Sequence, residues 1–287
     1  IECNCCWKKS EPSTLTTTTT TTTTHLPPVE EENRELYKLD TNSVGSKLTL
    51  NYQGRTSSDV KSDAAPQPLF SANTADPKEP LTLRLFRRLL DNYVASVKTP
   101  EENTKEENNE INAFLDAVMA TPLMIRLEEF LKQKKLLEGR LRPALYHIWF
   151  TSYSRSPSVI GSSGFEHVFL GEIKKSQVSG FHNWLFFEKE EQEKDINYKG
   201  YMTSLNLGDK GEILKMRFDW MNYTKPVGSM FVGTSPELEM ALYTLCFYAR
   251  QNAGCNLQMN NHRFRIKVYQ QTYNGKKVIG SAYPEIF

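Results

Sequence analysis

The stretch "GTSPELEMALYTLCFYAR", residues 233–250, carries the clearest structural signal in the chain. Thr234 or Ser235 can cap the first turn of a helix, because a side-chain hydroxyl accepts from a backbone N–H that has no partner there. Pro236 suits the first helical position, and Glu237 favours the positive end of the helix dipole. The stretch therefore predicts a helix that begins directly after its cap.

Segments on both sides of this helix have the composition of β-strands. Residues 213–223, "ILKMRFDWMNY", alternate polar and bulky side chains. Residues 263–273 and 276–284 flank Asn274-Gly275, a pair that favours a two-residue hairpin. Three earlier segments are also rich in aromatic and β-branched residues and are expected to be successive antiparallel strands. They are "LYHIWFTSYS" (145–154), "EHVFLGEIKK" (166–175) and "FHNWLFFEKEE" (181–191).

Helices are expected before these strands. Residues 81–97 place leucines at four-residue steps with arginines on the other side, which is typical of an amphipathic helix. A second helix is expected around Ile111–Val118, and a third over residues 123–137. Helices first and paired strands later indicate an α+β fold, with an N-terminal helical lobe followed by an antiparallel-sheet lobe.

The N-terminal part has a different composition. Residues 12–28, "PSTLTTTTTTTTTHLPP", cannot bury apolar surface, and the chain stays polar up to residue 77. We expect residues 1–77 to be low-complexity, Thr-rich and mostly disordered, and residues 78–287 to form the folded domain. Cys3, Cys5 and Cys6 resemble the remnant of a disulfide-rich module, and a zinc site is the alternative.

Composition also bounds the possible partners. The formal net charge of +1 excludes a globally basic surface, so any nucleic-acid binding depends on local charge. No apolar run approaches the roughly 20 residues that span a bilayer. The cysteine cluster and the threonine tract favour a secreted protein, which we expect to be a monomer.

Two histidines and a lysine form the main candidate site. Cleavage of RNA by its own 2′-OH needs a base, an acid and a cation that holds the charge growing on phosphorus. His167, His182 and Lys225 would supply these groups. The alternatives are that both histidines are structural, or that they bind a metal together with Glu172, although their spacing is unlike that of compact metal sites.

Three blocks of sequence resemble the EndoU family, the poly(U)-specific endoribonucleases of animals. They are "SSGFEHVFLGEIKKSQVSGFHNW" (162–184), "KPVGSMFVGTSPELEMALYTLCFYAR" (225–250) and "GSAYP" (280–284), and the resemblance covers roughly residues 78–287. It implies an enzyme that cuts single-stranded RNA at uridylates by 2′-OH transesterification. The ends it leaves are 2′,3′-cyclic phosphates, and a divalent ion, Mn²⁺ or Ca²⁺, stimulates it.

The resemblance also implies roles for particular residues. The catalytic trio falls on His167, His182 and Lys225. The supporting carboxylates fall on Glu166 and Glu172, and the uridine-handling residues on Ser281, Tyr283 and Ser229. A serine hydroxyl can read the pairing edge of uracil, and an aromatic ring can stack on the base.

The remaining charges leave two questions open. Arg263, Arg265 and Lys267 alternate on one strand, and they either contact phosphates or form an ordinary solvated face. Acidic segments at 101–110 and 188–195 are rich in oxygen ligands, but no metal ligands are assigned. The alternative function is a secreted module that binds RNA or another polyanion without cleaving it. Paired acid and base groups favour the enzyme, because a binding module has no use for them.

Overall fold

The computed structural model describes residues 28–59, 62–70, 78–91, 93–100, 104–156, 159–250 and 253–287. The cysteine cluster and almost all of the threonine tract lie outside the described residues, as does the beginning of the acidic segment 101–110.

The helices are α1 (Val29–Leu39), α2 (Leu81–Arg88), α3 (Lys105–Met119), α4 (Pro122–Gln133), α5 (Leu141–Phe150), α6 (Trp184–Gln192) and α7 (Pro236–Ala249). Shorter turns are η1 (Gly45–Lys47), η2 (Glu166–Leu170), which is π-helical, and η3 (Gly208–Lys210). The strands are β1 (Tyr153–Ser156), β2 (Val159–Ser162), β3 (Glu172–Lys174), β4 (Gln177–Ser179), β5 (Ile196–Asn206), β6 (Glu212–Trp220), β7 (Tyr223–Val232), β8 (Cys255–Met259), β9 (His262–Tyr273) and β10 (Lys276–Glu285).

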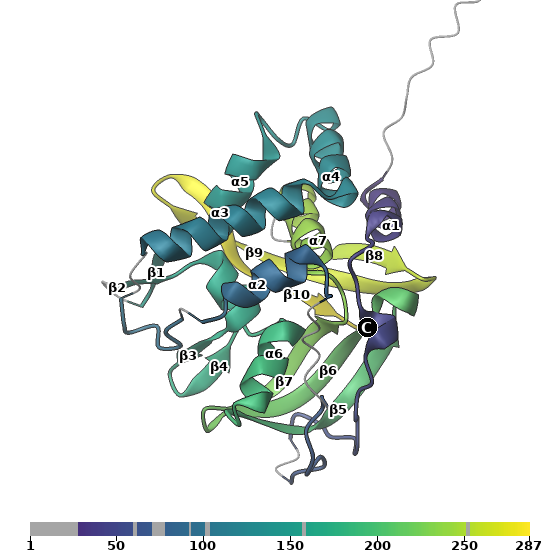
Figure 1. Cartoon of the computed structure of the whole chain (residues 1–287). Helices are drawn as coiled ribbons and strands as arrows, with labels where there is room; N and C mark the ends of the chain where they lie inside the picture. The colour runs from purple at the N-terminus through teal and green to yellow at the C-terminus, as the bar shows by residue number, and fades with distance from the viewer. Residues whose placement is uncertain are drawn as a thin grey trace, which may run out of the picture.

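The described chain forms two three-stranded antiparallel sheets, ordered β5-β6-β7 and β10-β9-β8, and two small hairpins, β1-β2 and β3-β4. Helices α3, α4 and α5 lie together at one end, and α6 lies against the β5-β6-β7 sheet (Figure 1). α7 packs between α4 and β9. The expected α+β architecture, helical first and sheet-rich later, is confirmed.

Local sequence accounts for several elements. Ser235 caps α7 as expected, since its Oγ accepts from the Leu238 N–H at 3.1 Å. The predicted hairpin is present between β9 and β10, where Asn274 and Gly275 have φ of +49° and +73°. Both residues of a type I′ turn need positive φ, so this pair fixes the β9-β10 connection.

Two segments expected as strands are helical, and the prediction was wrong for both. Residues 145–150 belong to α5, whose buried Leu141, Leu145, Ile148 and Trp149 follow helical spacing. Residues 184–191 belong to α6, which Asn183 caps by accepting from the Phe186 N–H at 3.1 Å. Aromatic content alone misled the assignment, because a buried helix is as rich in these residues as a strand.

The segment 166–175 is a strand only at its end. Residues 166–170 form the π-helical turn η2, in which all five side chains are buried, and β3 covers residues 172–174. The expected helix over 81–97 ends at Arg88, and Ser96 pairs with Ile173 instead. The expected helix over 123–137 likewise ends earlier, at Gln133.

The expectation of mostly disordered chain up to residue 77 is wrong for the described part, because α1 (Val29–Leu39) and the segments after it pack on the domain. α1 packs on α4 and β8, and its buried Glu32 forms an ion pair with Arg126 of α4 at 2.6 Å. Leu50 pairs with Phe70 as an isolated bridge. These contacts join residues 28–59 and 62–70 to the same domain.

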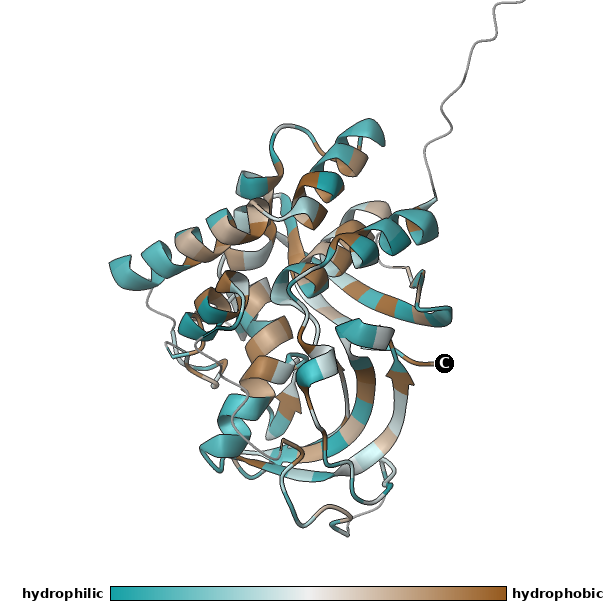
Figure 2. Cartoon of the chain, turned by 45° about the vertical axis from the view of Figure 1, so that its right-hand side comes forward, coloured by the Kyte–Doolittle hydropathy of each residue, from teal (hydrophilic) through white to brown (hydrophobic). Residues whose placement is uncertain are grey.

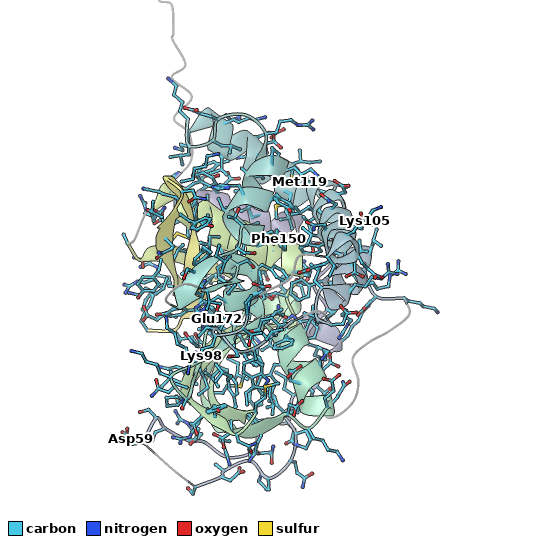
Figure 3. All side chains as sticks on the ribbon, turned by 90° about the vertical axis from the view of Figure 1, so that its left-hand side faces the viewer. Asp59, Lys98, Lys105, Met119, Phe150 and Glu172 are labelled. Carbon is cyan, nitrogen blue, oxygen red and sulfur yellow. A yellow bond between two sulfur atoms is a disulfide. The ribbon has the colours of Figure 1, made fainter. Side chains whose placement is uncertain are left out.

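Apolar faces point inward across both lobes (Figure 2). Aromatic side chains such as Phe150 lie in the interior, whereas Lys105 lies at the exposed start of α3 (Figure 3). Cys246 at the end of α7 and Cys255 of β8 form a buried disulfide. Across the described ranges, no helix has both the length and the apolar sequence needed to cross a bilayer.

Candidate active site

The turn η2 and the segment before α6 are joined through their backbones. The N–H of Phe181 donates to the His167 carbonyl at 3.1 Å, and the N–H of His182 donates to the Val168 carbonyl at 2.8 Å. These two bonds hold His167 and His182 on adjacent stretches of chain, although 14 residues lie between them in sequence.

Gly180 makes this approach possible. Its φ is +69°, and a Cβ there would lie 1.8 Å from the His167 carbonyl oxygen, so no larger residue fits without displacing the backbone. The next residue, Phe181, is also left-handed, with φ of +66°. A bulky residue in this region is strained, and such strain persists only where packing imposes it. Buried rings of Phe186, Phe218 and Trp220 surround Phe181 at centroid distances of 4.9–5.1 Å.

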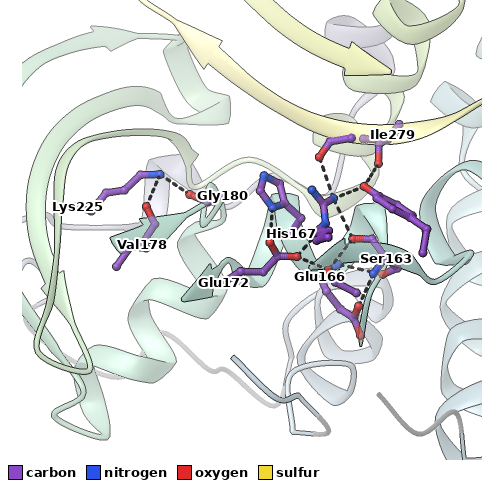
Figure 4. A network of polar contacts seen from close by, with 12 residues as sticks. Ser163, Glu166, His167, Glu172, Val178, Gly180, Lys225 and Ile279 are labelled. Atoms are coloured by element: carbon purple, nitrogen blue, oxygen red, sulfur yellow. Dashed lines mark hydrogen bonds and ion pairs between the residues drawn. The ribbon is translucent and has the colours of Figure 1, made fainter. Parts of the chain in front are cut away.

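His167 is held by a carboxylate. Its Nδ1 lies 2.9 Å from Oε2 of Glu172, whose other oxygen forms an ion pair with Arg155 at 2.9 Å and accepts from Ser162 (Figure 4). The carboxylate requires the imidazole to donate from Nδ1, which leaves Nε2 as the free ring nitrogen. Burial, together with the Arg155 charge, lowers the pKa of His167 to about 4, although Glu172 opposes this change.

His182 is held by a backbone carbonyl. Its Nδ1 donates to the Ser229 carbonyl at 2.7 Å, so Nε2 is again the free nitrogen. The ring stacks on Tyr283 of β10 with centroids 5.0 Å apart. Burial places the pKa of His182 well below its usual value, and the nearby positive charge of Lys225 adds to this effect.

Lys225 enters the same region from β7. Its Nζ donates to the carbonyl of Gly180 at 2.8 Å and to that of Val178 at 3.4 Å (Figure 4). Only 9% of the residue is exposed, and this burial lowers the pKa of Lys225 to about 8. The ammonium therefore remains largely charged at neutral pH but is weakly solvated.

These groups share one pocket of about 430 Å³, at the seam where β7 meets β10. The Oγ of Ser229 donates to the Pro284 carbonyl at 2.5 Å across this seam. The pocket brings together six of the residues singled out in the sequence, namely His167, His182, Lys225, Ser229, Ser281 and Tyr283.

The two glutamates have different positions. Glu172 lies behind His167 and acts on the pocket through that ring. Glu166 faces a separate small cavity beside Glu107, and its carboxylate accepts from the Ser163 N–H at 2.5 Å. Burial raises the pKa of Glu166 to about 7. Glu166 and His167 are neighbours in the π-helical turn, but only His167 lines the pocket.

Sequence reasoning missed two positively charged residues of the site. Arg155 neutralises Glu172, but its segment, "YSRSPS", gives no signal of this role. Lys215 of β6 lines the pocket, yet in sequence it is one of several alternating charged residues. Arg265 and Lys267, for which phosphate contact and a solvated strand face were left open, approach Glu285 at 3.4 and 3.9 Å. Glu285 itself lines the pocket.

The described pocket offers a poor metal site. Glu285 is the only carboxylate among the residues that line it, and that group already faces two cations. The acidic segment at 188–195 does bring together Glu190, Glu193 and Asp195, whose carboxylate oxygens lie within 4.8 Å of one another. Lys189 pairs with the first two. None of the three lines the pocket.

Taken together, the pocket presents two neutral imidazole nitrogens and a buried ammonium to whatever occupies it. A neutral imidazole accepts a proton, an imidazolium donates one, and an ammonium in a low-dielectric site stabilises negative charge more strongly than it does in water. This set of groups suits acid–base chemistry on an anionic substrate.

The known proteins to which this chain is similar are endoribonucleases. The family model described as "Endoribonuclease XendoU" matches residues 29–284. The chain is 37% identical over 265 residues to a uridylate-specific endoribonuclease of Drosophila melanogaster, covering 88% of this chain and 81% of that protein. It is 38% identical to the Bos taurus uridylate-specific endoribonuclease, covering 89% of this chain and 64% of that protein.

A solved structure is also similar. The structure of XendoU, described as a splicing-independent snoRNA-processing endoribonuclease, superimposes with a TM-score of 0.73 at 34% identity. The match covers 90% of this chain and 97% of the XendoU chain. The family match to residues 29–284 includes α1, in agreement with the packing of α1 on α4 and β8.

The substitution Gly180→Ala tests the backbone arrangement. The added Cβ cannot fit against the His167 carbonyl, so we expect the free energy of unfolding to fall by several kcal/mol, on the order of what severe overpacking costs. Gly139→Ala is the matched control, because Gly139 is also left-handed, with φ of +81°, but has open space around it. That control should cost only about 1 kcal/mol. Equal losses in denaturant titrations of the two variants would contradict the packing argument.

Proposed function

The chain belongs to the XendoU family of endoribonucleases, and we propose that it cleaves single-stranded RNA at uridylates by attack of the 2′-OH on the adjacent phosphate. Its products would end in 2′,3′-cyclic phosphates. The observation that carries this proposal is the shared pocket of His167, His182 and Lys225, because the reaction needs two proton-transfer groups and one fixed cation around a single phosphodiester.

The environments of the two histidines support different roles. Of the two rings, only His167 has a carboxylate beside it that opposes the lowering of its pKa, so we assign His167 as the general acid that protonates the leaving 5′ oxygen. Its ring is neutral in the free protein and would take up its proton when the anionic phosphate enters the pocket. Burial of His182 and the positive charge of Lys225 favour the neutral ring, and the Ser229 carbonyl opposes them only in part. We assign it as the base that removes the 2′ proton. In this scheme Lys225 stabilises the charge that develops on the phosphoryl oxygens.

Uridine recognition is assigned to the β7–β10 seam. Tyr283 presents an aromatic face beside the His182 ring, and stacking of this kind is worth about 1–3 kcal/mol per base without selecting among bases. Selectivity therefore requires hydrogen bonds to the uracil edge. Ser281 is the better candidate of the two serines, since the Ser229 hydroxyl already donates to the Pro284 carbonyl.

We propose that Mn²⁺ or Ca²⁺ stimulates the reaction, as the family resemblance implies, and that the ion acts outside the reacting pocket. The single carboxylate of the pocket supports this view, because both ions prefer several oxygen ligands. We also propose export to an oxidising compartment, which the buried Cys246–Cys255 disulfide supports.

Alanine substitutions test the assigned roles. His167→Ala and His182→Ala should each lower kcat by about 10²–10⁴-fold, the usual contribution of a general acid or base. Lys225→Ala should lower kcat by a similar factor while the affinity for a 2′-deoxyuridine oligonucleotide falls much less. Cleavage of a U-containing oligonucleotide is measured by gel, with the cyclic phosphate identified by mass spectrometry.

The control for this experiment is Glu129→Ala, on the exposed face of α4, which should cleave like the wild type. Binding of the oligonucleotide without any cleavage, with Mn²⁺ or Ca²⁺ added, would favour the polyanion-binding module instead.

Burial of Lys225 also predicts a stability effect that depends on pH. The depression of its pKa from 10.5 to about 8 means that folding opposes the charged form, at a cost of about 3 kcal/mol. This cost is fully present below pH 8 and disappears as pH rises towards 10.5. Lys225→Met should therefore be more stable than the wild type at pH 7, and the difference should shrink between pH 8 and 10.5.

Denaturant titrations across this pH range measure the difference. Lys132→Met removes an exposed lysine from α4 and should show no such trend. If Lys225→Met were destabilised at pH 7, the argument that the ammonium is held at the expense of stability would be wrong.

A further inference from the structure

The charged groups of the pocket are not equally engaged by the protein. Lys225 donates to two carbonyls, and Glu285 faces Arg265 and Lys267. Lys215 also lines the pocket, but within the described part of the chain its ammonium makes no hydrogen bond or ion pair. It is therefore the one cation of the pocket, among described residues, that remains available to a ligand.

Neighbours on the same strand show that this is not a general property of β6. Arg217 donates to the Ser58 carbonyl at 2.7 Å, and Asp219 accepts from Thr224 and pairs with Lys199 at 3.3 Å. The other charged side chains at this end of β6 are thus engaged by contacts within the protein.

Strand register places the two lysines at different ends of the pocket. Lys215 lies opposite Ser229, the residue whose carbonyl holds His182, whereas Lys225 lies opposite Phe218. Lys215 and Phe218 are three positions apart on β6, which corresponds to about 10 Å along the strand. Two ammonium groups anchored this far apart suit two successive phosphates better than one.

We propose that Lys215 binds a phosphate that flanks the scissile one. This inference rests on the proposed function, because it takes the scissile phosphate to lie among His167, His182 and Lys225. A lysine suits the role as a mobile point charge that attracts phosphate without demanding one geometry. On the other rim Arg265 and Lys267 already face Glu285, so among the described residues the cation without a partner lies on β6. The RNA backbone therefore leaves the pocket over β6 and the base lies towards β10.

Small substrates test the proposal by adding one phosphate at a time. The dinucleoside UpA contains only the scissile phosphate, pUpA adds one on the 5′ side, and UpAp adds one on the 3′ side. Lys215→Met should lower kcat/KM on pUpA or on UpAp by about fivefold more than on UpA, the factor that a contact of roughly 1 kcal/mol provides. The substrate with the larger loss identifies the side on which the phosphate binds.

Lys132→Met removes the same charge from α4 and controls for net charge. A loss of equal size on all three substrates, no loss on any, or the same pattern in Lys132→Met would overturn the proposal. On a longer oligonucleotide, Lys215→Met should also reduce the dependence of log affinity on log salt by about 0.7, the value for one single-strand phosphate contact.

Binding of 2′-deoxyuridine oligonucleotides separates this inference from the proposed function. These ligands cannot be cleaved, so their salt dependence in wild type and Lys215→Met reports the phosphate contact alone. A wild-type protein that cleaves none of the substrates would contradict the proposed function. In that case a smaller salt dependence of binding in Lys215→Met would still support the phosphate site, and an unchanged salt dependence would contradict it.

Discussion

The left-handed turn at Gly180 and Phe181 is the constraint on which the site depends. It brings the chain back against η2 closely enough for the His167 and Val168 carbonyls to accept from it. The same turn directs the Gly180 carbonyl to Lys225. The aromatic rings packed around Phe181 impose its strained backbone conformation. The packed core therefore keeps His167, His182 and Lys225 in their relative positions.

Burial then determines the chemistry of these groups. Removal from water lowers the pKa of both imidazoles, so the two rings are neutral, and it also lowers the pKa of the Lys225 ammonium. In such a site an ammonium acts strongly on charge that develops nearby, because few water molecules screen it. The free protein bears the cost of a buried cation, and in the proposed reaction the incoming phosphate would relieve that cost. Glu172 adds a fixed negative charge behind one ring only, which distinguishes two otherwise similar histidines.

Sequence reasoning succeeded where structure is set locally. The cap of α7 and the Asn274-Gly275 hairpin need only their own residues, and both were predicted. It failed between residues 145 and 191, where helices and turns are buried on most sides, so that apolar residues lose their diagnostic spacing. His167, His182 and Lys225 were singled out from the chemistry that RNA cleavage needs, whereas Ser229, Ser281 and Tyr283 were identified through the family resemblance. Lys215 and Arg155 were not, because their significance appears only when distant strands and turns meet.

Nitrogen NMR of the histidine side chains tests the central claim most directly. Both rings donate from Nδ1, to Glu172 in one case and to the Ser229 carbonyl in the other. The ¹⁵N spectrum of the free protein at pH 7 should therefore show His167 and His182 as neutral rings with Nδ1 protonated and Nε2 bare. An imidazolium signal from either ring at this pH, or a ring protonated at Nε2, would contradict the account.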